Sequence, residues 1–103
     1  MIYLMVTLHI QRRRTPEWSQ NYEKHVLPIL TKHGQKLVGS WKTAIGVYDE
    51  VTNLYVFENY GEMERIRKEV AADPDWIEYM KGPGLINHEI CKLIEPLSFS
   101  PMK

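Results

Sequence analysis

The order of strand-like and helix-like segments constrains the fold of this chain more strongly than any single motif. Runs rich in β-branched and large apolar residues predict strands over residues 2–10, 36–45, 51–60 and 85–94. Apolar residues spaced three and four apart predict helical segments after the first and third of these strands. Strand, helix, strand, strand, helix, strand is the order of the split βαβ unit. The sequence therefore predicts an α+β domain in which both helical segments lie on one face of a four-stranded antiparallel sheet.

Residues that favour helix ends mark the limits of the first helix. Thr15 is expected to cap it, and Pro16 suits the first turn because the N–H groups there have no helical partner. Pro28 lies within the apolar stripe and predicts a kink. Gly34 is expected to adopt a left-handed conformation and to end the helix.

Similar signals divide the second helical segment. It is expected to begin near Gly61 and to break at Asp73, which then caps a further turn or two with Pro74 in the first position. The segment Gly82-Pro83-Gly84 predicts its end. In the second strand, Gly39 indicates a bulge or a close approach of another group.

Composition and charge narrow the class of protein. The 103 residues suit one domain covering 1–103, and 44% hydrophobic and 25% charged residues are ordinary for a globular chain. The formal net charge of zero argues against nucleic acid as a partner. No apolar run approaches the roughly 20 residues needed to cross a bilayer, and Met1–Val6 indicates a strand rather than a signal peptide. We therefore expect a cytoplasmic protein that does not insert into a membrane.

Two helical segments cover only one face of such a sheet, so the other face needs a partner. By alternation along the predicted strands, the uncovered face is expected to carry Trp41, Tyr55, Phe57, Ile86 and Ile90. An exposed apolar face of this kind predicts association. A symmetric homodimer packed sheet to sheet would enclose a barrel. The sequence therefore predicts a homodimer with a ligand site inside this barrel.

Several stretches of the chain, taken in order, resemble a known family. They are Met1-Ile2-Tyr3, residues 34–41 (GQKLVGSW) with Gly46, Val51 followed by Leu54, residues 73–76 (DPDW) and the tail 96–101 (PLSFSP). Over nearly the whole chain this pattern is similar to the NIPSNAP family of the dimeric α/β-barrel superfamily. The resemblance implies a ferredoxin-like protomer and a homodimer, and it implies no agreed catalytic signature.

The positions at which the chain departs from that family indicate an apolar interior. Members of the family usually carry a glutamate at the position of Leu4 and an arginine at that of Val6, and often a glutamate at that of Ile90. The resemblance thus implies that apolar side chains replace polar ones inside the barrel. We expect a cavity suited to an apolar or aromatic small molecule.

The candidate site combines one histidine with a few polar groups on the strands. His88 is the candidate general acid or base, because histidine titrates near neutral pH, and the alternative is a structural histidine in the dimer interface. Tyr55 is a candidate catalytic residue that, with Asn53, would orient a carbonyl or hydroxyl group. The other candidate substrate-binding residues are Trp41, Phe57, Ile90, Lys92, Leu4 and Val6.

Two functions are consistent with these residues. The first is a cofactor-independent enzyme that acts on an apolar or aromatic substrate as a cyclase, isomerase or monooxygenase. The second is a non-catalytic binding or adaptor protein whose barrel is filled by its own side chains. His9 is expected on the opposite strand face from His88, which argues against a metal shared by the two. We expect no metal and no cofactor, with haem at His88 as a minor option.

Overall fold

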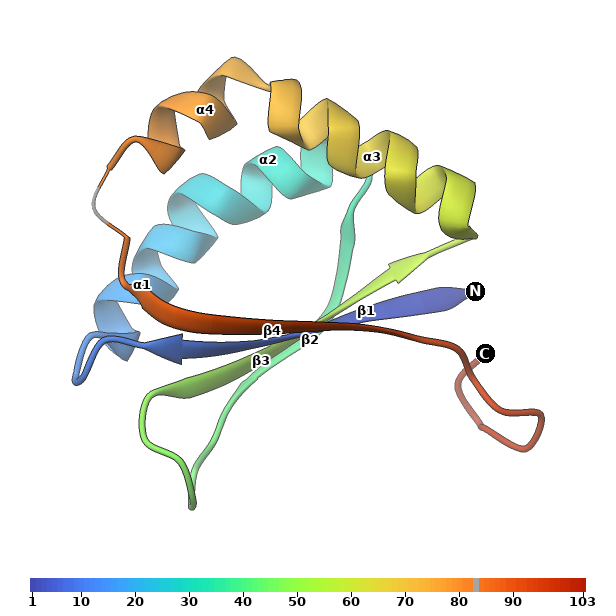
Figure 1. Cartoon of the computed structure of the whole chain (residues 1–103), viewed down its shortest axis with the longest axis horizontal. Coiled ribbons are helices and arrows are strands. Elements are labelled where there is room, and N and C mark those ends of the chain that lie inside the picture. The colour runs from blue at the N-terminus through green and yellow to red at the C-terminus, as the bar shows by residue number, and fades with distance from the viewer. Residues whose placement is uncertain (83) are drawn as a thin grey trace.

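The computed structural model describes residues 1–82 and 84–103, and it contains one four-stranded sheet and a helical layer (Figure 1). The elements are β1 (Ile2–Ile10), α1 (Thr15–Asn21), the π-helical turn η1 (Tyr22–Val26), α2 (Leu27–Lys32), β2 (Lys36–Lys42), β3 (Glu50–Phe57), α3 (Tyr60–Ala72), α4 (Pro74–Met80) and β4 (Ile86–Ile94). The strand order is β2-β3-β1-β4, and each neighbouring pair is antiparallel. The expected α+β, ferredoxin-like arrangement is confirmed.

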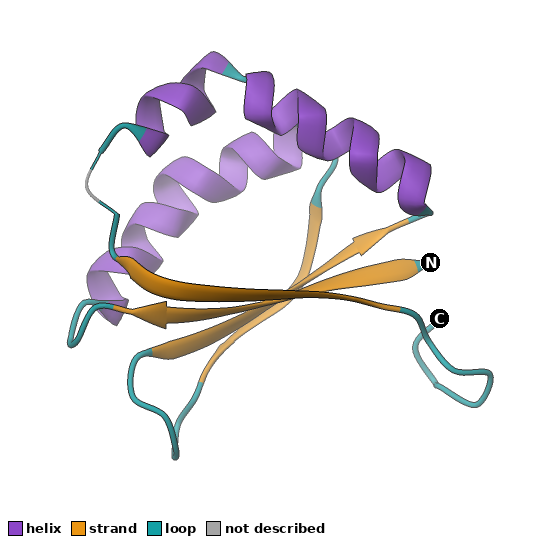
Figure 2. Ribbon diagram, viewed as in Figure 1, coloured by secondary structure: helices purple, strands orange, loops and turns teal. Residues whose placement is uncertain are grey.

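The helices lie together on one face of the sheet (Figure 2). The even-numbered residues of β1, from Ile2 to Ile10, are buried, and so are the odd-numbered residues of β3. In the register of these strands Leu4 lies opposite Tyr55 and Val6 lies opposite Asn53. Directly opposed residues share a face, so these four side chains belong to the face that the helices cover.

The expectation that Tyr55 and Phe57 lie on the uncovered face is therefore wrong. Tyr55 is 5% exposed and Phe57 is 1% exposed, both beneath the helical layer. The reason is that β1 is apolar on both faces. Alternation then groups the residues of a strand into two sets without saying which set the helices cover.

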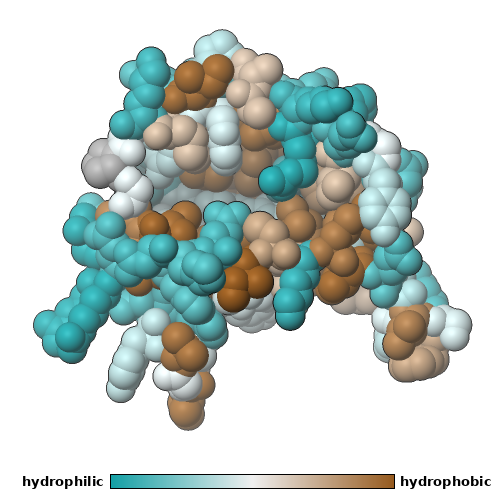
Figure 3. Space-filling view, in the orientation of Figure 1, coloured by the Kyte–Doolittle hydropathy of each residue, from teal (hydrophilic) through white to brown (hydrophobic). Residues whose placement is uncertain are grey.

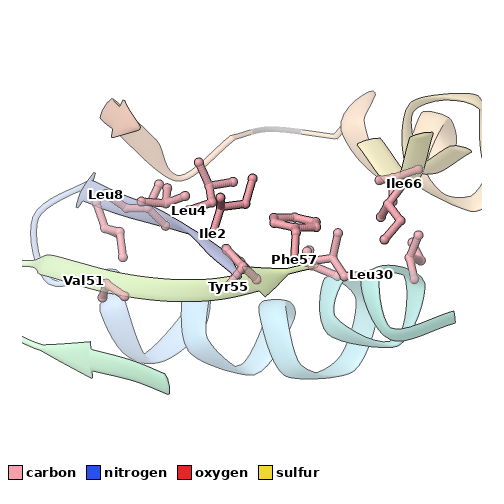
Figure 4. Close-up of a cluster of buried hydrophobic side chains, with 13 residues drawn as sticks. Ile2, Leu4, Leu8, Leu30, Val51, Tyr55, Phe57 and Ile66 are labelled. Atoms are coloured by element: carbon pink, nitrogen blue, oxygen red, sulfur yellow. The ribbon is translucent and has the colours of Figure 1, made fainter. Parts of the chain in front are cut away.

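The hydrophobic core joins the covered sheet face to the helices (Figure 4). Phe57 and Ile66 are its most deeply buried apolar side chains, each 1% exposed. Phe57 lies at the end of β3, and Ile66 lies on the buried side of α3. Close packing of this kind fixes the helices on the sheet at one end of the molecule.

Two bulges shift the strand register. The register between β2 and β3 shifts between Leu37 and Gly39, which confirms the bulge expected at Gly39. A second shift, between His9 and Ile10, brings Ile10 opposite Ile86 while His9 remains opposite His88. The extra residue in β4 places Ile86 and His88 on opposite faces. The expectation that they share a face is wrong because sequence alternation does not reveal this bulge.

The first helical segment departs from its expected form at two points. Thr15 does not cap α1, because the N-cap is Arg14 and the Thr15 hydroxyl donates instead to Asp49 Oδ1 at 2.7 Å. The irregularity expected at Pro28 takes the form of η1, in which the Leu27 N–H donates to the Tyr22 carbonyl. Pro28 then lies in the first turn of α2, where its missing N–H is tolerated.

The ends of the remaining helices follow the sequence closely. Gly34 has a φ of 92°, a left-handed value that confirms its expected role at the end of the helix. Asp73 caps α4 as expected, accepting a hydrogen bond from the Asp75 N–H at 2.8 Å. The stop expected at Gly82-Pro83-Gly84 includes Pro83, which lies outside the described residues.

Asp73 also ties the end of α2 to the junction of α3 and α4. Its carboxylate lies 2.8 Å from Lys32 Nζ and 2.6 Å from His33 Nε2. These bonds, led by the one from Lys32, hold the pKa of Asp73 well below its ordinary value. The two helical segments are thus joined by one buried carboxylate.

Candidate functional site

A cavity of about 800 Å³ lies between the helices and the covered face of the sheet. Figure 3 shows the molecule hollowed between the helical layer and the sheet below it. The floor is apolar, and the walls carry aromatic rings from the helices. Its lining includes Leu4, Val6 and Leu8 of β1, Asn53 and Tyr55 of β3, and Trp18, Tyr22 and Trp76 of the helical layer.

A chain of hydrogen bonds crosses the sheet and ends in this cavity. The Ser40 hydroxyl donates to Asn53 Oδ1 at 2.5 Å, and Asn53 Nδ2 donates to the Tyr55 hydroxyl at 3.4 Å. The Tyr55 and Tyr22 hydroxyl oxygens lie 2.5 Å apart. Asn53 is 1% exposed, and its amide is satisfied only through these neighbours in the part of the chain that the structure describes. The chain therefore fixes the phenol of Tyr55 beneath the helices.

The local fold positions the two tyrosines. Tyr22 opens the π-helical turn, and its ring stacks on that of Trp18 at a centroid distance of 5.0 Å. Tyr55 lies in the centre of β3, opposite Leu4. One phenol thus approaches from the helices and the other from the sheet, and they meet between the two layers.

Burial keeps both phenols protonated. Loss of solvent raises the pKa of Tyr55, and it raises the pKa of Tyr22 further because Tyr55 is an unfavourable neighbour for a second phenolate. A neutral phenol donates a hydrogen bond and does not act as a base near pH 7. The pair is therefore suited to polarising an oxygen atom of a ligand.

Other polar groups reach the cavity from its edges. Gln35 is 4% exposed and lines the cavity. His25 stacks on Tyr79 at a centroid distance of 5.5 Å, and both line the cavity. Glu89 reaches it from β4. The cavity thus combines an apolar floor with several polar and charged groups at its edges.

The structure brings together only some of the residues predicted for the site. Leu4, Val6, Asn53 and Tyr55 line the cavity, while Phe57 lies on the same sheet face within the core. The remaining predicted residues do not join this site, because the pairing of β4 with β1 and of β2 with β3 places them on the opposite face. Those residues, on the uncovered face, are His88, Ile90, Lys92 and, from β2, Trp41.

The uncovered face carries its own polar cluster. His9 lies opposite His88, with ring centroids 5.7 Å apart, and His9 Nε2 is 3.1 Å from Glu50 Oε2. The expectation that His9 and His88 lie on different faces is wrong, because the two residues are direct partners in the register. Within residues 1–82 and 84–103 no group of three or more acidic, histidine or cysteine residues is arranged to hold a metal ion.

The sequence patterns alone do not mark Tyr22, Gln35 or His25 as site residues. Tyr22 belongs to the apolar stripe of the first helix, and a tyrosine on such a stripe carries a hydroxyl that needs a buried partner. That signal was available. Gln35 gives no such signal, because its burial depends on the turn between α2 and β2.

The fold and the cavity define the class as a ferredoxin-like α+β domain with a hollow between its two layers. The chain belongs to the NIPSNAP family, whose sequence model matches residues 3–101. No helix in the described part of the chain is both long and apolar enough to span a membrane.

Solved structures of the family are similar over the full length. A NIPSNAP family protein of unknown function from Agrobacterium tumefaciens is 26% identical with a TM-score of 0.91, and the match covers 100% of this chain and 94% of that one. An uncharacterised NIPSNAP domain protein from Burkholderia xenovorans is 25% identical with a TM-score of 0.88, and the match covers 98% and 99% of the two chains. No match is found among curated proteins.

A more distant likeness extends the fold beyond the family. A putative antibiotic biosynthesis monooxygenase from Nitrosomonas europaea has a TM-score of 0.66 at 6% identity, covering 94% of this chain and 99% of that one. At this identity the likeness concerns the fold alone.

Proposed function

We propose that this NIPSNAP domain binds an apolar or aromatic small molecule in the cavity between its helices and its sheet. The observation that carries the proposal is the cavity itself. Its volume of about 800 Å³ falls within the range of roughly 300–1,000 Å³ that is usual for small-molecule sites. This site lies within one protomer, whereas the sequence predicts a site in the barrel between the sheets of two protomers.

The same geometry favours proton-transfer chemistry if the bound molecule is a substrate. The phenol of Tyr22, with the Tyr55 hydroxyl hydrogen-bonded to it, would stabilise negative charge that develops on a substrate oxygen, as a donor of an oxyanion hole does. His88 lies on the opposite sheet face, so His25 and Glu89, which line the cavity, replace it as candidate acid or base groups. An isomerase or cyclase acting without a cofactor is the reaction class that these groups support.

Binding is tested by narrowing the cavity without touching the core. Ala71 is an exposed residue of α3 that lines the cavity, and its neighbour Ala72 is exposed but does not line it. We expect Ala71→Trp to weaken the binding of N-phenyl-1-naphthylamine, an apolar fluorescent probe, and Ala72→Trp to leave it unchanged. Equal binding by both variants, or no binding by the unsubstituted protein, would contradict the proposal. Native mass spectrometry of the protein purified from its host would identify a molecule carried with it.

We further propose that a second copy of this chain covers the free sheet face. Trp41 is 56% exposed there, Ile90 41% and Ile94 39%, and a sheet face of this apolar character favours association. We expect a dimer by size-exclusion chromatography with light scattering. Ile90→Lys should shift it towards monomer, whereas Ile77→Lys, at a site on α4 that is 47% exposed, should not. A monomer before substitution would refute the dimer. We also propose that the protein is cytoplasmic.

A further inference from the structure

The hydrogen bonds that join Ser40, Asn53, Tyr55 and Tyr22 leave one hydroxyl donor that the protein does not use. Asn53 Nδ2 donates to the Tyr55 oxygen, so the hydroxyl hydrogen of Tyr55 must be directed elsewhere. Two phenols carry two hydroxyl hydrogens, and the contact between Tyr22 and Tyr55 uses one of them. The second has no acceptor among the described residues. One phenolic hydrogen is therefore free to meet a ligand.

The direction of this series of hydrogen bonds decides which tyrosine carries the free hydrogen. Ser40 donates to Asn53, and Asn53 donates to Tyr55. Either hydroxyl can donate in the contact between Tyr55 and Tyr22, and we take Tyr55 as the donor because that continues the series in one direction. Successive hydrogen bonds in one direction polarise one another, so the last hydroxyl is the strongest donor. Tyr22, which lines the cavity and is less buried than Tyr55, holds that position.

We propose that the ligand of this cavity carries a carbonyl or enolate oxygen on an aromatic or apolar body, and that Tyr22 donates a hydrogen bond to this oxygen. The inference rests on the proposed binding function and adds the chemical class of the ligand. Ser40 and Asn53 are positioning residues, since they act on the ligand only through the tyrosines. Gln35, which is 4% exposed and lines the cavity, offers it a second polar contact.

The apolar surroundings strengthen this selection. Leu4, Val6 and Leu8 form the floor of the cavity, and Trp18 stacks on the Tyr22 ring. An unsatisfied hydroxyl in such a place costs free energy, so a ligand without an acceptor would leave the donor unpaired. A molecule of the same shape that has a carbonyl should bind more tightly for that reason.

The test compares two probes that differ only in the oxygen. 2-Acetylnaphthalene carries a carbonyl, whereas 2-ethylnaphthalene has the same ring and nearly the same shape without an acceptor. Isothermal titration should show the acetyl compound binding about three- to tenfold more tightly, the range expected for one hydrogen bond. In Tyr22→Phe this preference should disappear while 2-ethylnaphthalene still binds. Tyr60→Phe, which removes a hydroxyl that bonds to Glu95 far from the cavity, should keep the preference.

A second variant guards against a structural effect of the first. Ser40 is exposed at its surface position, and Ser40→Ala removes only the bond that orients the Asn53 amide. If the chain acts as a directed series, this distant change should reduce the ratio of the two affinities, which a purely structural role would not alter.

The outcomes separate the two proposals. If neither naphthalene binds, the proposed binding function fails and this inference fails with it. If both bind equally to the unsubstituted protein, the cavity binds apolar molecules but the inference is refuted. Equal binding is also the result expected if the Asn53 amide is reversed, because Tyr22 would then donate to Tyr55, Tyr55 would donate to Asn53 Oδ1, and no phenolic hydrogen would remain. A preference that survives Tyr22→Phe would likewise overturn it.

Discussion

The bond between Tyr22 and Tyr55 predicts a measurable coupling in stability. We consider the variants Tyr22→Phe and Tyr55→Phe and their combination. Each removes one hydroxyl oxygen, and the rings remain to fill the same space. A hydrogen bond contributes about 0.5–1.5 kcal/mol net to the free energy of unfolding. The coupling between the two sites should therefore be about 0.5–1.5 kcal/mol, because the bond can be lost only once.

The two single variants should differ in size. Tyr55→Phe also removes the acceptor of Asn53 Nδ2, and Asn53 is 1% exposed. An unsatisfied buried donor costs about 1–3 kcal/mol, so Tyr55→Phe should destabilise the domain more than Tyr22→Phe. In a domain of this size each 1 kcal/mol lowers Tm by about 4–8 °C.

Urea unfolding at neutral pH, followed by tryptophan fluorescence, measures all four free energies. Tyr60→Phe is the matched control, because its hydroxyl bonds to an exposed carboxylate of Glu95, and its unfolding midpoint should not change. The reasoning is refuted if the effects of Tyr22→Phe and Tyr55→Phe add within about 0.3–0.5 kcal/mol, the agreement usual for independent sites. It is also refuted if Tyr22→Phe is the more costly of the two.

Three further predictions follow from the fold. Ile66→Ala should cost about 2–5 kcal/mol in denaturant unfolding, because Ile66 is 1% exposed, and a loss below about 1 kcal/mol would mean that the packing around it is loose. The hydrogen bonds from Lys32 and then His33 lower the pKa of Asp73, so the Asp73 carboxylate stabilises the fold fully above its ordinary pKa of 3.8, and this stabilisation is lost as the pH falls through the folded pKa. The difference in free energy of unfolding between the unsubstituted protein and Asp73→Asn should therefore shrink below about pH 4. A difference that stays constant with pH would contradict this. Partial burial, with a hydrogen bond to Glu89, raises the pKa of Cys91 to about 11. The rate of alkylation by iodoacetamide should therefore keep rising up to that pH, and a rate that levels off near pH 8.5 would exclude the shift.

Most of the fold could be predicted because local chemistry determines it. Pro74 after Asp73 and the glycine at position 34 act through the backbone within a few residues, and both behave as expected. The order of strands and helices follows from periodicity for the same reason. Thr15 is an exception, since a distant partner, Asp49, takes the hydroxyl that was expected to cap the helix.

The candidate site could be predicted only in part. Grouping Leu4 and Val6 with Asn53 and Tyr55 was right, because these positions oppose one another in adjacent strands. Adding His88 to the group was wrong, because the pairing of β4 with β1 places it opposite His9. The acid or base role of His88 thus loses its geometric support, and the roles of Tyr55 and Asn53 stay predictions that the proposed experiments test.

The sequence by itself determined the kinds of elements, their order and the alternation within each strand. These depend on interactions between residues close together in the chain, which composition and spacing record. Only the tertiary structure decided which face of β1 the helices cover, and therefore where the cavity lies. That choice depends on how the sheet packs against the helices, while the register shift in β4 decides on which face Ile86 lies. A shift of one residue turns every later side chain to the other face, and long-range packing alone selects the register.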